Sequence, residues 1–196
     1  MIHWFIRRVK LFGSICATFL FRTHVSRWRK VAHAGPPPWD DRNKVIAGFV
    51  PAGSSVLDIG CGAQTLRGYL PPGCRYQPCD VVKSTPDVIL CDFNAGQYPD
   101  ASLRFDYVIC SGVFEYIRQP KEFLHRIPRL GGIVLFSYNP FLPGTSKLVR
   151  LGYNWVNHFT QKELEAGFDE AGLAWAVLKT NQPEFLIYSL KIKDAA

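Results

Sequence analysis

The stretch VLDIGCGAQTL, residues 56–66, decides the fold of this chain. It is typical of a buried strand that leads into a glycine turn and then a helix. Gly60 and Gly62 would let the backbone approach a ligand closely, and such turns commonly bind phosphorylated nucleotides. Asp58 stands directly before the turn, and its charge would repel a phosphate group there. The stretch therefore predicts a nucleotide-like ligand with an unusual charge.

Strand and helix patterns alternate around this stretch, which is typical of an α/β sheet. Helices are expected over 42–50, 64–70, 120–130 and 161–172, the last beginning with a capping-box pair, Thr160 and Glu163. Strands are expected over 55–59, 75–80, 88–91, 105–110, 133–137, 173–179 and 184–192. Residues 138–158 are expected to form a long loop. We therefore predict a Rossmann-like, mostly parallel sheet of seven strands with an antiparallel last strand and helices on both faces.

Charge divides the 196 residues into two parts. Residues 1–39 hold seven of the 23 basic residues and no acidic residue, so residues 40–196 hold 16 basic and 16 acidic residues. We predict a basic N-terminal helical segment, 1–39, followed by one domain, 40–196. A neutral domain argues against nucleic acid as a partner, because such binding requires basic side chains across the binding face.

The front segment has an apolar helical face over residues 2–21. Its longest stretch without a charge, 11–21, has 11 residues, whereas a membrane-spanning helix needs about 20. Three interpretations remain: a helix that covers the domain's pocket, an interfacial helix that inserts Trp4 and phenylalanines into an anionic membrane, or an organelle-targeting peptide. The proline-rich joint at 35–38 would separate the segment from the domain. The expected location is the cytoplasm, with the second interpretation adding the inner membrane face.

The cysteine pattern predicts neither a disulfide framework nor a metal site. No two cysteines form a CxxC pair, and no His/Cys cluster has zinc spacing. We interpret the cysteines as reduced residues of a cytosolic core.

Acidic residues close the second and third predicted strands. Asp80 can accept both hydroxyls of a ribose, while Asp92 and Phe93 can contact a base. A dinucleotide is disfavoured, because Thr65 stands where the third glycine of its motif would be. S-adenosylmethionine resolves the conflict at Asp58, since it carries an adenosine and an ammonium group but no phosphate.

Four stretches resemble class I S-adenosylmethionine-dependent methyltransferases of the small-molecule type, with a methyltransferase type 11/12-like domain. VLDIGCG is similar to the family's first motif, FDYVICSGVFEYI to its fourth strand, RLGGIVLFSYNP to its fifth strand, and HFTQKELEAGFDEAGL to its late helix. The likeness runs from about residue 54 to 172, although Tyr116 replaces a frequent histidine. The resemblance implies S-adenosylmethionine as cofactor. The residues expected to bind it are Asp58, Gly60, Cys61, Gly62, Asp80, Val81, Asp92, Phe93, Ser111 and Gly112.

The acceptor side is less defined. Glu115, Tyr138 and His158 are the candidate catalytic residues. Each has an alternative role: Glu115 could instead belong to the cofactor pocket or to a helix start, His158 could satisfy a helix terminus, and Tyr138 could be a turn residue. A base is needed only when the acceptor holds its proton tightly. Aromatic residues of the same region either line an acceptor pocket or pack in the core; they are Phe141, Tyr153, Trp155 and Phe159.

The resemblance implies methyl transfer by in-line displacement to a small-molecule, lipid or glycan-intermediate acceptor. Two alternatives stay open. One is a catalytically weak S-adenosylmethionine-binding subunit that supports a partner protein. The other is a nucleic-acid or protein methyltransferase that uses the basic cluster at 27–30.

Overall fold

The computed structural model describes residues 2–34, 40–178 and 185–193, with side chains from residue 11 onward. The expected proline-rich joint, and residues 179 and 184 at the ends of two predicted strands, lie outside these ranges. The described chain forms one seven-stranded sheet in the order β3-β2-β1-β4-β5-β7-β6. Its strands are β1 (Ser55–Ile59), β2 (Arg75–Asp80), β3 (Ile89–Leu90), β4 (Phe105–Cys110), β5 (Gly131–Tyr138), β6 (Leu173–Leu178) and β7 (Leu186–Ile192).

The predicted mostly parallel, Rossmann-like sheet is confirmed. Pairs among β1 to β5 are parallel, whereas β7 runs antiparallel between β5 and β6. Strands β2 and β3 lie on one side of β1, whereas β4 and β5 lie on the other side. Ligands of such sheets bind at the switch point between β1 and β4, beyond the carboxyl ends of the strands.

Two hydrophobic clusters show that helices cover both faces of the sheet. On one face, α4 (Pro120–Arg126) and α6 (Gln161–Glu170) pack through Phe123 and Phe168 against inward residues of the strands. On the other face, α3 (Asp41–Ala47) packs through Ile46 against Val56 and Ile109. This alternation follows from the two-residue period of a strand.

Several predicted elements differ in length. The helix expected over 64–70 is only a 3-10 turn, η1 (Thr65–Gly68), because Gln64 adopts a left-handed conformation with φ of 57° before it. The helix expected over 120–130 divides into α4 and η4 (Ile127–Leu130), since Pro128 lacks the N–H that an α-helix would use. The expected loop over 138–158 contains a helix, α5 (Lys147–Gly152). Two short 3-10 turns, η2 (Phe93–Ala95) and η3 (Phe114–Tyr116), follow β3 and β4.

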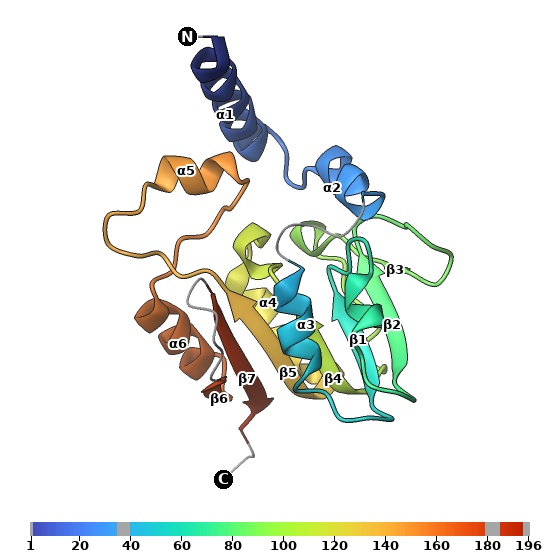
Figure 1. Cartoon of the computed structure of the whole chain (residues 1–196). Coiled ribbons are helices and arrows are strands. Elements are labelled where there is room, and N and C mark those ends of the chain that lie inside the picture. Colours follow the sequence, from blue (N-terminus) through green and yellow to red (C-terminus); the bar gives the residue numbers. More distant parts are fainter. Residues whose placement is uncertain (1, 35–39, 179–184, 194–196) are drawn as a thin grey trace.

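The front segment forms two helices, α1 (Ile2–Leu20) and α2 (Val25–Ala32). Figure 1 shows α1, α2 and α5 gathered at one end of the molecule, beyond the arrowhead of β5 and opposite the C-terminus. A Cβ on Gly152 would collide with Leu11, so the glycine allows α1 to pack closely on α5. The segment therefore lies at the carboxyl end of the parallel strands, where a ligand is expected.

Side chains of the domain fasten the front segment by hydrogen bonds. The Asn154 amide nitrogen donates to the Ser14 carbonyl (3.0 Å) and to Thr18 Oγ1 (2.6 Å). Arg118 donates to the carbonyls of Thr18, Phe21 and Arg22 at the end of α1. A cation at this position also complements the negative end of the helix dipole.

Candidate active site

A cavity of about 520 Å³ opens at the carboxyl ends of β1, β2 and β4. Its walls come from the glycine turn, from the loops after β2, β3 and β4, from α2 and α3, and from the 138–158 segment. All ten residues expected to bind the cofactor line it: Asp58, Gly60, Cys61, Gly62, Asp80, Val81, Asp92, Phe93, Ser111 and Gly112. Residues separated by more than 50 positions in sequence thus meet in one site.

The glycine turn is held against the end of β2. The N–H groups of Gly60 and Cys61 donate to the Cys79 carbonyl at 2.8 and 3.1 Å, and Gly62 N–H donates to Asp80 Oδ2 at 2.9 Å. Gly60 has φ of 71°, and a Cβ there would lie 2.5 Å from Val113 Cγ2. The first glycine is therefore required by both its conformation and its surroundings.

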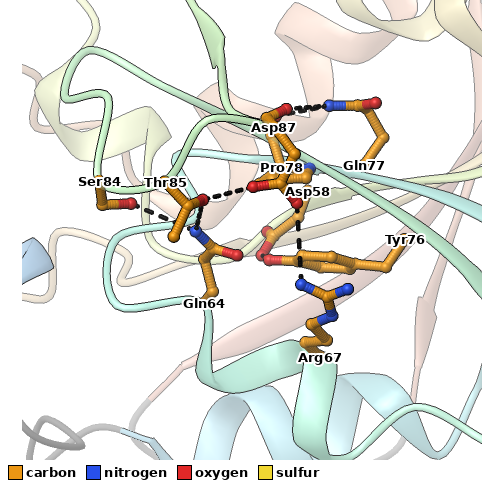
Figure 2. A network of polar contacts seen from close by, with 9 residues as sticks. All are labelled: Asp58, Gln64, Arg67, Tyr76, Gln77, Pro78, Ser84, Thr85 and Asp87. Atoms are coloured by element: carbon orange, nitrogen blue, oxygen red, sulfur yellow. Dashed lines mark hydrogen bonds and ion pairs between the residues drawn. The ribbon is translucent and has the colours of Figure 1, made fainter.

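A polar network supports this turn from outside (Figure 2). The Gln64 amide donates to Ser84 Oγ (3.2 Å) and Thr85 Oγ1 (2.7 Å), which joins the loop after β1 to the loop after β2. Thr85 then donates to Asp87 at 2.5 Å, and Arg67 lies 3.7 Å from the same carboxylate. The network fixes the two loops that follow Asp58 and Asp80.

Asp58 is 3% exposed and accepts a 2.6 Å hydrogen bond from the Tyr76 hydroxyl, also visible in Figure 2. Burial raises the pKa of Asp58 to about 7; the Tyr76 hydrogen bond acts in the opposite direction and the nearby Asp80 charge raises it further. A cationic group beside Asp58 would favour its ionised form and would replace the water lost by burial. This carboxylate therefore fits an ammonium group and not a phosphate.

Asp80 is oriented by the backbone. Its Oδ2 accepts from Gly62 N–H and its Oδ1 from Val82 N–H, both at 2.9 Å. Burial raises the pKa of Asp80, while these backbone hydrogen bonds oppose the shift. Each oxygen retains a lone pair, which is the arrangement needed to accept two ribose hydroxyls.

Asp92 lines the cavity just after β3. Its Oδ1 accepts from Asn94 N–H (3.0 Å) and from the Thr23 hydroxyl (2.7 Å) of the front segment. Phe93 is buried and packs edge-on against Phe123. Asp92, which is expected on the adenine side, is thus joined directly to the front segment that lines the cavity.

Arg42, on α3, is a cavity residue that the sequence analysis did not single out. Its guanidinium is buried, and Nε donates to Ser111 Oγ at 3.0 Å. Burial lowers the pKa of Arg42, an effect that the Glu115 charge partly offsets. Among the residues that the structure describes, no carboxylate forms an ion pair with Arg42. Because buried charges are normally paired, this guanidinium is suited to an anionic group of a ligand.

Gly112 lies beneath this arginine. A Cβ at Gly112, which has φ of 67°, would collide with the guanidinium. The only sequence signals for Arg42 are its place at the start of the predicted helix 42–50 and the glycine at 112 that leaves room for it. Neither signal shows that the side chain turns into the cavity.

Glu115 is 1% exposed and lines the same cavity. Its Oε1 accepts from the backbone N–H (3.0 Å) and the side-chain amide (2.8 Å) of Asn139. Its Oε2 is buried and has no hydrogen-bond partner among the described residues. A buried carboxylate oxygen without a donor is costly, so this atom is suited to receive a donor from a ligand.

Aromatic side chains surround this part of the cavity. Trp28 of α2 packs edge-on against Tyr116, with ring centroids 4.5 Å apart, and Trp155 Nε1 lies 3.1 Å from the Tyr116 hydroxyl. Tyr153 also lines the cavity, so two of the four aromatic residues proposed from the sequence do so. The other two, Phe141 and Phe159, are not among the described lining residues, and Phe159 packs against the core.

Two predicted catalytic residues lie elsewhere. Neither Tyr138 nor His158 is among the described residues that line the cavity. Tyr138 is fully buried, donates to Asn157 at 2.8 Å and accepts from Phe159 N–H at 2.9 Å. His158 accepts from Arg150 Nε at 3.2 Å, and burial and the Arg150 charge lower its pKa. Their hydrogen bonds organise the 138–158 segment, because Arg150 also donates to the Asn139 carbonyl. This placement argues against direct contact with an acceptor.

The geometry is that of the class I S-adenosylmethionine-dependent methyltransferases: a seven-stranded sheet with a reversed β7, a glycine turn after β1, and acidic residues at the end of β2 and after β3. The profile of the methyltransferase domain family matches residues 31–177. The chain belongs to this family, and its cofactor is S-adenosylmethionine.

Solved structures of methyltransferases share this fold. CalO1, a methyltransferase in calicheamicin biosynthesis solved with S-adenosylhomocysteine, is 21% identical over 77% of this chain and 53% of its own, with a TM-score of 0.60. The 1,6-didemethyltoxoflavin-N1-methyltransferase of Burkholderia thailandensis is 17% identical over 78% of this chain and 77% of its own, with a TM-score of 0.58. A putative O-methyltransferase from Nostoc punctiforme PCC 73102 is 16% identical over 93% of this chain and 68% of its own, with a TM-score of 0.70.

This chain therefore spans about half the length of CalO1. A search of curated proteins found no match.

Proposed function

We propose that this protein is an active methyltransferase that transfers the methyl group of S-adenosylmethionine to an N–H or O–H group of a small-molecule, lipid or glycan-intermediate acceptor. One observation carries the proposal. The cavity that contains the expected cofactor residues is also lined by a buried carboxylate oxygen, Glu115 Oε2, that has no partner among the described residues.

In the part of the cavity that would hold the cofactor, which we call the cofactor half, each polar residue would bind one group of the ligand. S-adenosylmethionine, when bound, supplies a methyl group already activated on a sulfonium. Arg42 would bind the methionine carboxylate, since its buried charge has no acidic partner among the described residues. Asp58 would bind the ammonium group, and Asp80 the ribose hydroxyls.

Two further residues complete this half. Asp92 would accept from the adenine side, with Phe93 beside it. The neutral thiol of Cys61, whose pKa burial raises, completes the wall without adding charge. The fit is supported at Gly62, which has φ of 50° and borders open space, since a Cβ there would have only Val31 Cγ1 nearby, at 3.9 Å.

On the acceptor half, Glu115 would orient the reacting group. Its Oε1 is fixed by two hydrogen bonds from Asn139, so Oε2 is held in one position. A hydrogen bond from the acceptor to Oε2 would direct the acceptor lone pair, and the same oxygen would take the proton released on methylation. Trp28, Tyr116 and Trp155 would pack against an apolar or ring-shaped part of the acceptor and exclude water.

The direct experiment compares Glu115→Gln with Glu170→Gln. Glutamine at 115 retains an oxygen for Asn139 but replaces the proton-accepting oxygen by an amide. Glu170 is exposed and pairs with Lys121 far from the cavity. Transfer of labelled methyl to a panel of amines, phenols, sugars and lipid extracts is measured first for the unaltered protein, and then for both variants on the best acceptor.

We expect Glu115→Gln to lower kcat by about 10²- to 10⁴-fold while the Kd for S-adenosylhomocysteine changes less than about twofold. Glu170→Gln should behave as the unaltered protein. Full activity of Glu115→Gln would reduce Glu115 to a structural role. Tight cofactor binding without transfer to any acceptor would instead favour a cofactor-binding subunit that needs a partner protein.

A further inference from the structure

Exposed apolar side chains concentrate on the front segment and on the 138–158 segment. Seven of them are between 52% and 78% exposed: Phe12, Phe19, Leu20, Phe21, Leu142, Leu148 and Tyr153. We call these residues the apolar end. Since α1 packs on α5 through Leu11 and Gly152, both sets lie at the same end of the molecule, as Figure 1 shows for the two helices. Concentrated exposed apolar residues of this size mark an interaction surface.

The arrangement on α1 separates an attached side from an exposed side. Leu11 and Thr18 face the domain. Leu11 lies against Gly152, and the Thr18 hydroxyl donates to the Leu151 carbonyl at 3.1 Å. Phe12 and Phe19 are seven residues apart, so they project from the same flank of the helix. The apolar flank of α1 therefore stays exposed when α1 packs on the domain.

The charged residues around the apolar end indicate which kind of partner fits this surface. Exposed cations accompany the apolar end at Arg22, Arg29, Lys30 and Lys147. No acidic residue occurs among residues 1–39, whereas the remainder of the chain is formally neutral. A cationic, aromatic surface complements an anionic lipid headgroup layer, with the aromatic rings at the boundary of the acyl chains.

The helices do not suit a crossing of the bilayer. In the described part of the chain, no helix is long and apolar enough to span a membrane. A helix of this kind lies in the plane of the interface.

The apolar end also adjoins the mouth of the active-site cavity. Tyr153 belongs to both, because it is 54% exposed and lines the cavity. Thr23 and Trp28, which follow α1 directly, line the cavity as well.

We propose that α1 and α5 together bind the surface of an anionic bilayer, with the cavity mouth directed toward the lipid headgroups. This docking does not depend on methyl transfer, so it can be tested separately. It would deliver an acceptor from the membrane surface to the side of the cavity lined by Trp28 and Trp155.

The test is sedimentation of the full chain with vesicles of phosphatidylcholine, with or without phosphatidylglycerol, at low and high salt. The variant Phe12→Ser/Phe19→Ser/Leu20→Ser removes three side chains of the apolar end. The control, Leu90→Ser/Val177→Ser/Ile192→Ser, replaces three exposed apolar residues of the sheet. Calorimetry with S-adenosylhomocysteine shows that each variant is folded.

We expect binding to the anionic vesicles at low salt, a loss of at least about fivefold in the bound fraction for the α1 variant, and unchanged binding for the control. High salt should weaken binding, since screening reduces attraction between the cations and the lipid. The proposal is overturned if the unaltered protein stays in the supernatant, or if the α1 variant binds as well as the control. A dimer in size-exclusion chromatography that the α1 variant abolishes, without vesicle binding, would assign the surface to a second copy and also overturn it. Cofactor binding measured in parallel separates each of these failures from a failure of the proposed function.

Discussion

The two halves of the cavity are built in different ways. The cofactor half consists of backbone turns at strand ends, and its key carboxylate, Asp80, is bound by N–H groups of the adjoining loops. The acceptor half consists of side chains from α2, η3 and the 138–158 segment, joined by contacts such as Trp28 against Tyr116. The first half is fixed by the sheet itself. The second depends on a segment docked from the N-terminus, so the two should respond differently to substitution.

The largest effect is expected at Arg42. Arg42→Met should weaken binding of S-adenosylhomocysteine by about 10- to 150-fold, because hydrogen bonds to charged groups contribute about 1.5–3 kcal/mol. Binding of methylthioadenosine, which lacks the amino-acid part, should change less than about twofold. Calorimetric titration of both ligands measures this difference. Arg104→Met, at an exposed position, is the control. An equal loss for both ligands would show that Arg42 supports the fold of the site and not the carboxylate.

The next effect is expected at Asp80. Asp80→Ala should weaken both ligands by about 1–3 kcal/mol, because both carry the ribose and a buried hydrogen-bonding partner is lost. The glycine turn also loses the acceptor of Gly62 N–H. Asp100→Ala, which removes an exposed carboxylate that accepts from Ser102 N–H of its own turn, serves as control. Unchanged affinity in the Asp80 variant would contradict the assignment of the ribose site.

A smaller effect is expected from pH. With the Asp58 pKa raised to about 7, ionised Asp58 becomes scarce at pH 6. If the ammonium group binds ionised Asp58, affinity for S-adenosylhomocysteine should fall by about eightfold between pH 7.5 and pH 6. Calorimetry over this range measures it. Asp58→Asn should bind more weakly and show a flat profile, and a retained pH dependence in that variant would assign it to another group.

The same pKa has an opposite consequence for stability. The folded-state pKa of Asp58 lies above its unfolded value, so the folded state holds the proton more tightly. Its contribution to the free energy of unfolding is therefore greatest at acid pH and is lost as the pH rises from about 4 to about 7. Urea unfolding of the unaltered protein and of Asp58→Asn should differ in this direction.

The smallest effect on cofactor affinity is expected from a substitution at Asn154, which holds the front segment beside the acceptor half. Asn154 has φ of 63°, and its amide accepts from Arg27 at 2.6 Å and donates to Ser14 and Thr18. Asn154→Gly keeps the backbone conformation available and removes the three hydrogen bonds. Tryptic cleavage within 22–30 should accelerate by at least about fivefold, since buried hydrogen bonds contribute about 1 kcal/mol each. Affinity for S-adenosylhomocysteine should fall less than about threefold.

Asn154→Asp provides an intermediate case, because it retains an oxygen for Arg27 and loses the two donated bonds. If trypsin cleaves the front segment of both variants as slowly as that of the unaltered protein, docking of this segment through Asn154 is contradicted. A large loss of cofactor affinity would show that the two halves are energetically coupled, with the Thr23 hydrogen bond to Asp92 as the evident link.

The sequence by itself predicted the order of the seven strands along the chain, the glycine turn and ten candidate residues for the cofactor half, although not Arg42. Strands over 55–59, 75–80 and 105–110 occur as predicted, because a two-residue period, apolar runs and flanking glycine and proline are local signals. All ten residues predicted to bind the cofactor line one cavity, because the carboxyl ends of parallel strands meet at one edge of the sheet.

Only the tertiary structure decided the rest. It placed Arg42 beside Ser111, left Glu115 Oε2 without a described partner, and kept Tyr138 and His158 out of the described cavity lining. It also revealed α5 and joined it to α1, so that an apolar end emerges from two segments more than 100 residues apart. These features depend on which side chains meet across long sequence separations and on which direction each side chain points. Residue spacing carries that information within one helix or strand, whereas packing between elements determines it for the whole site.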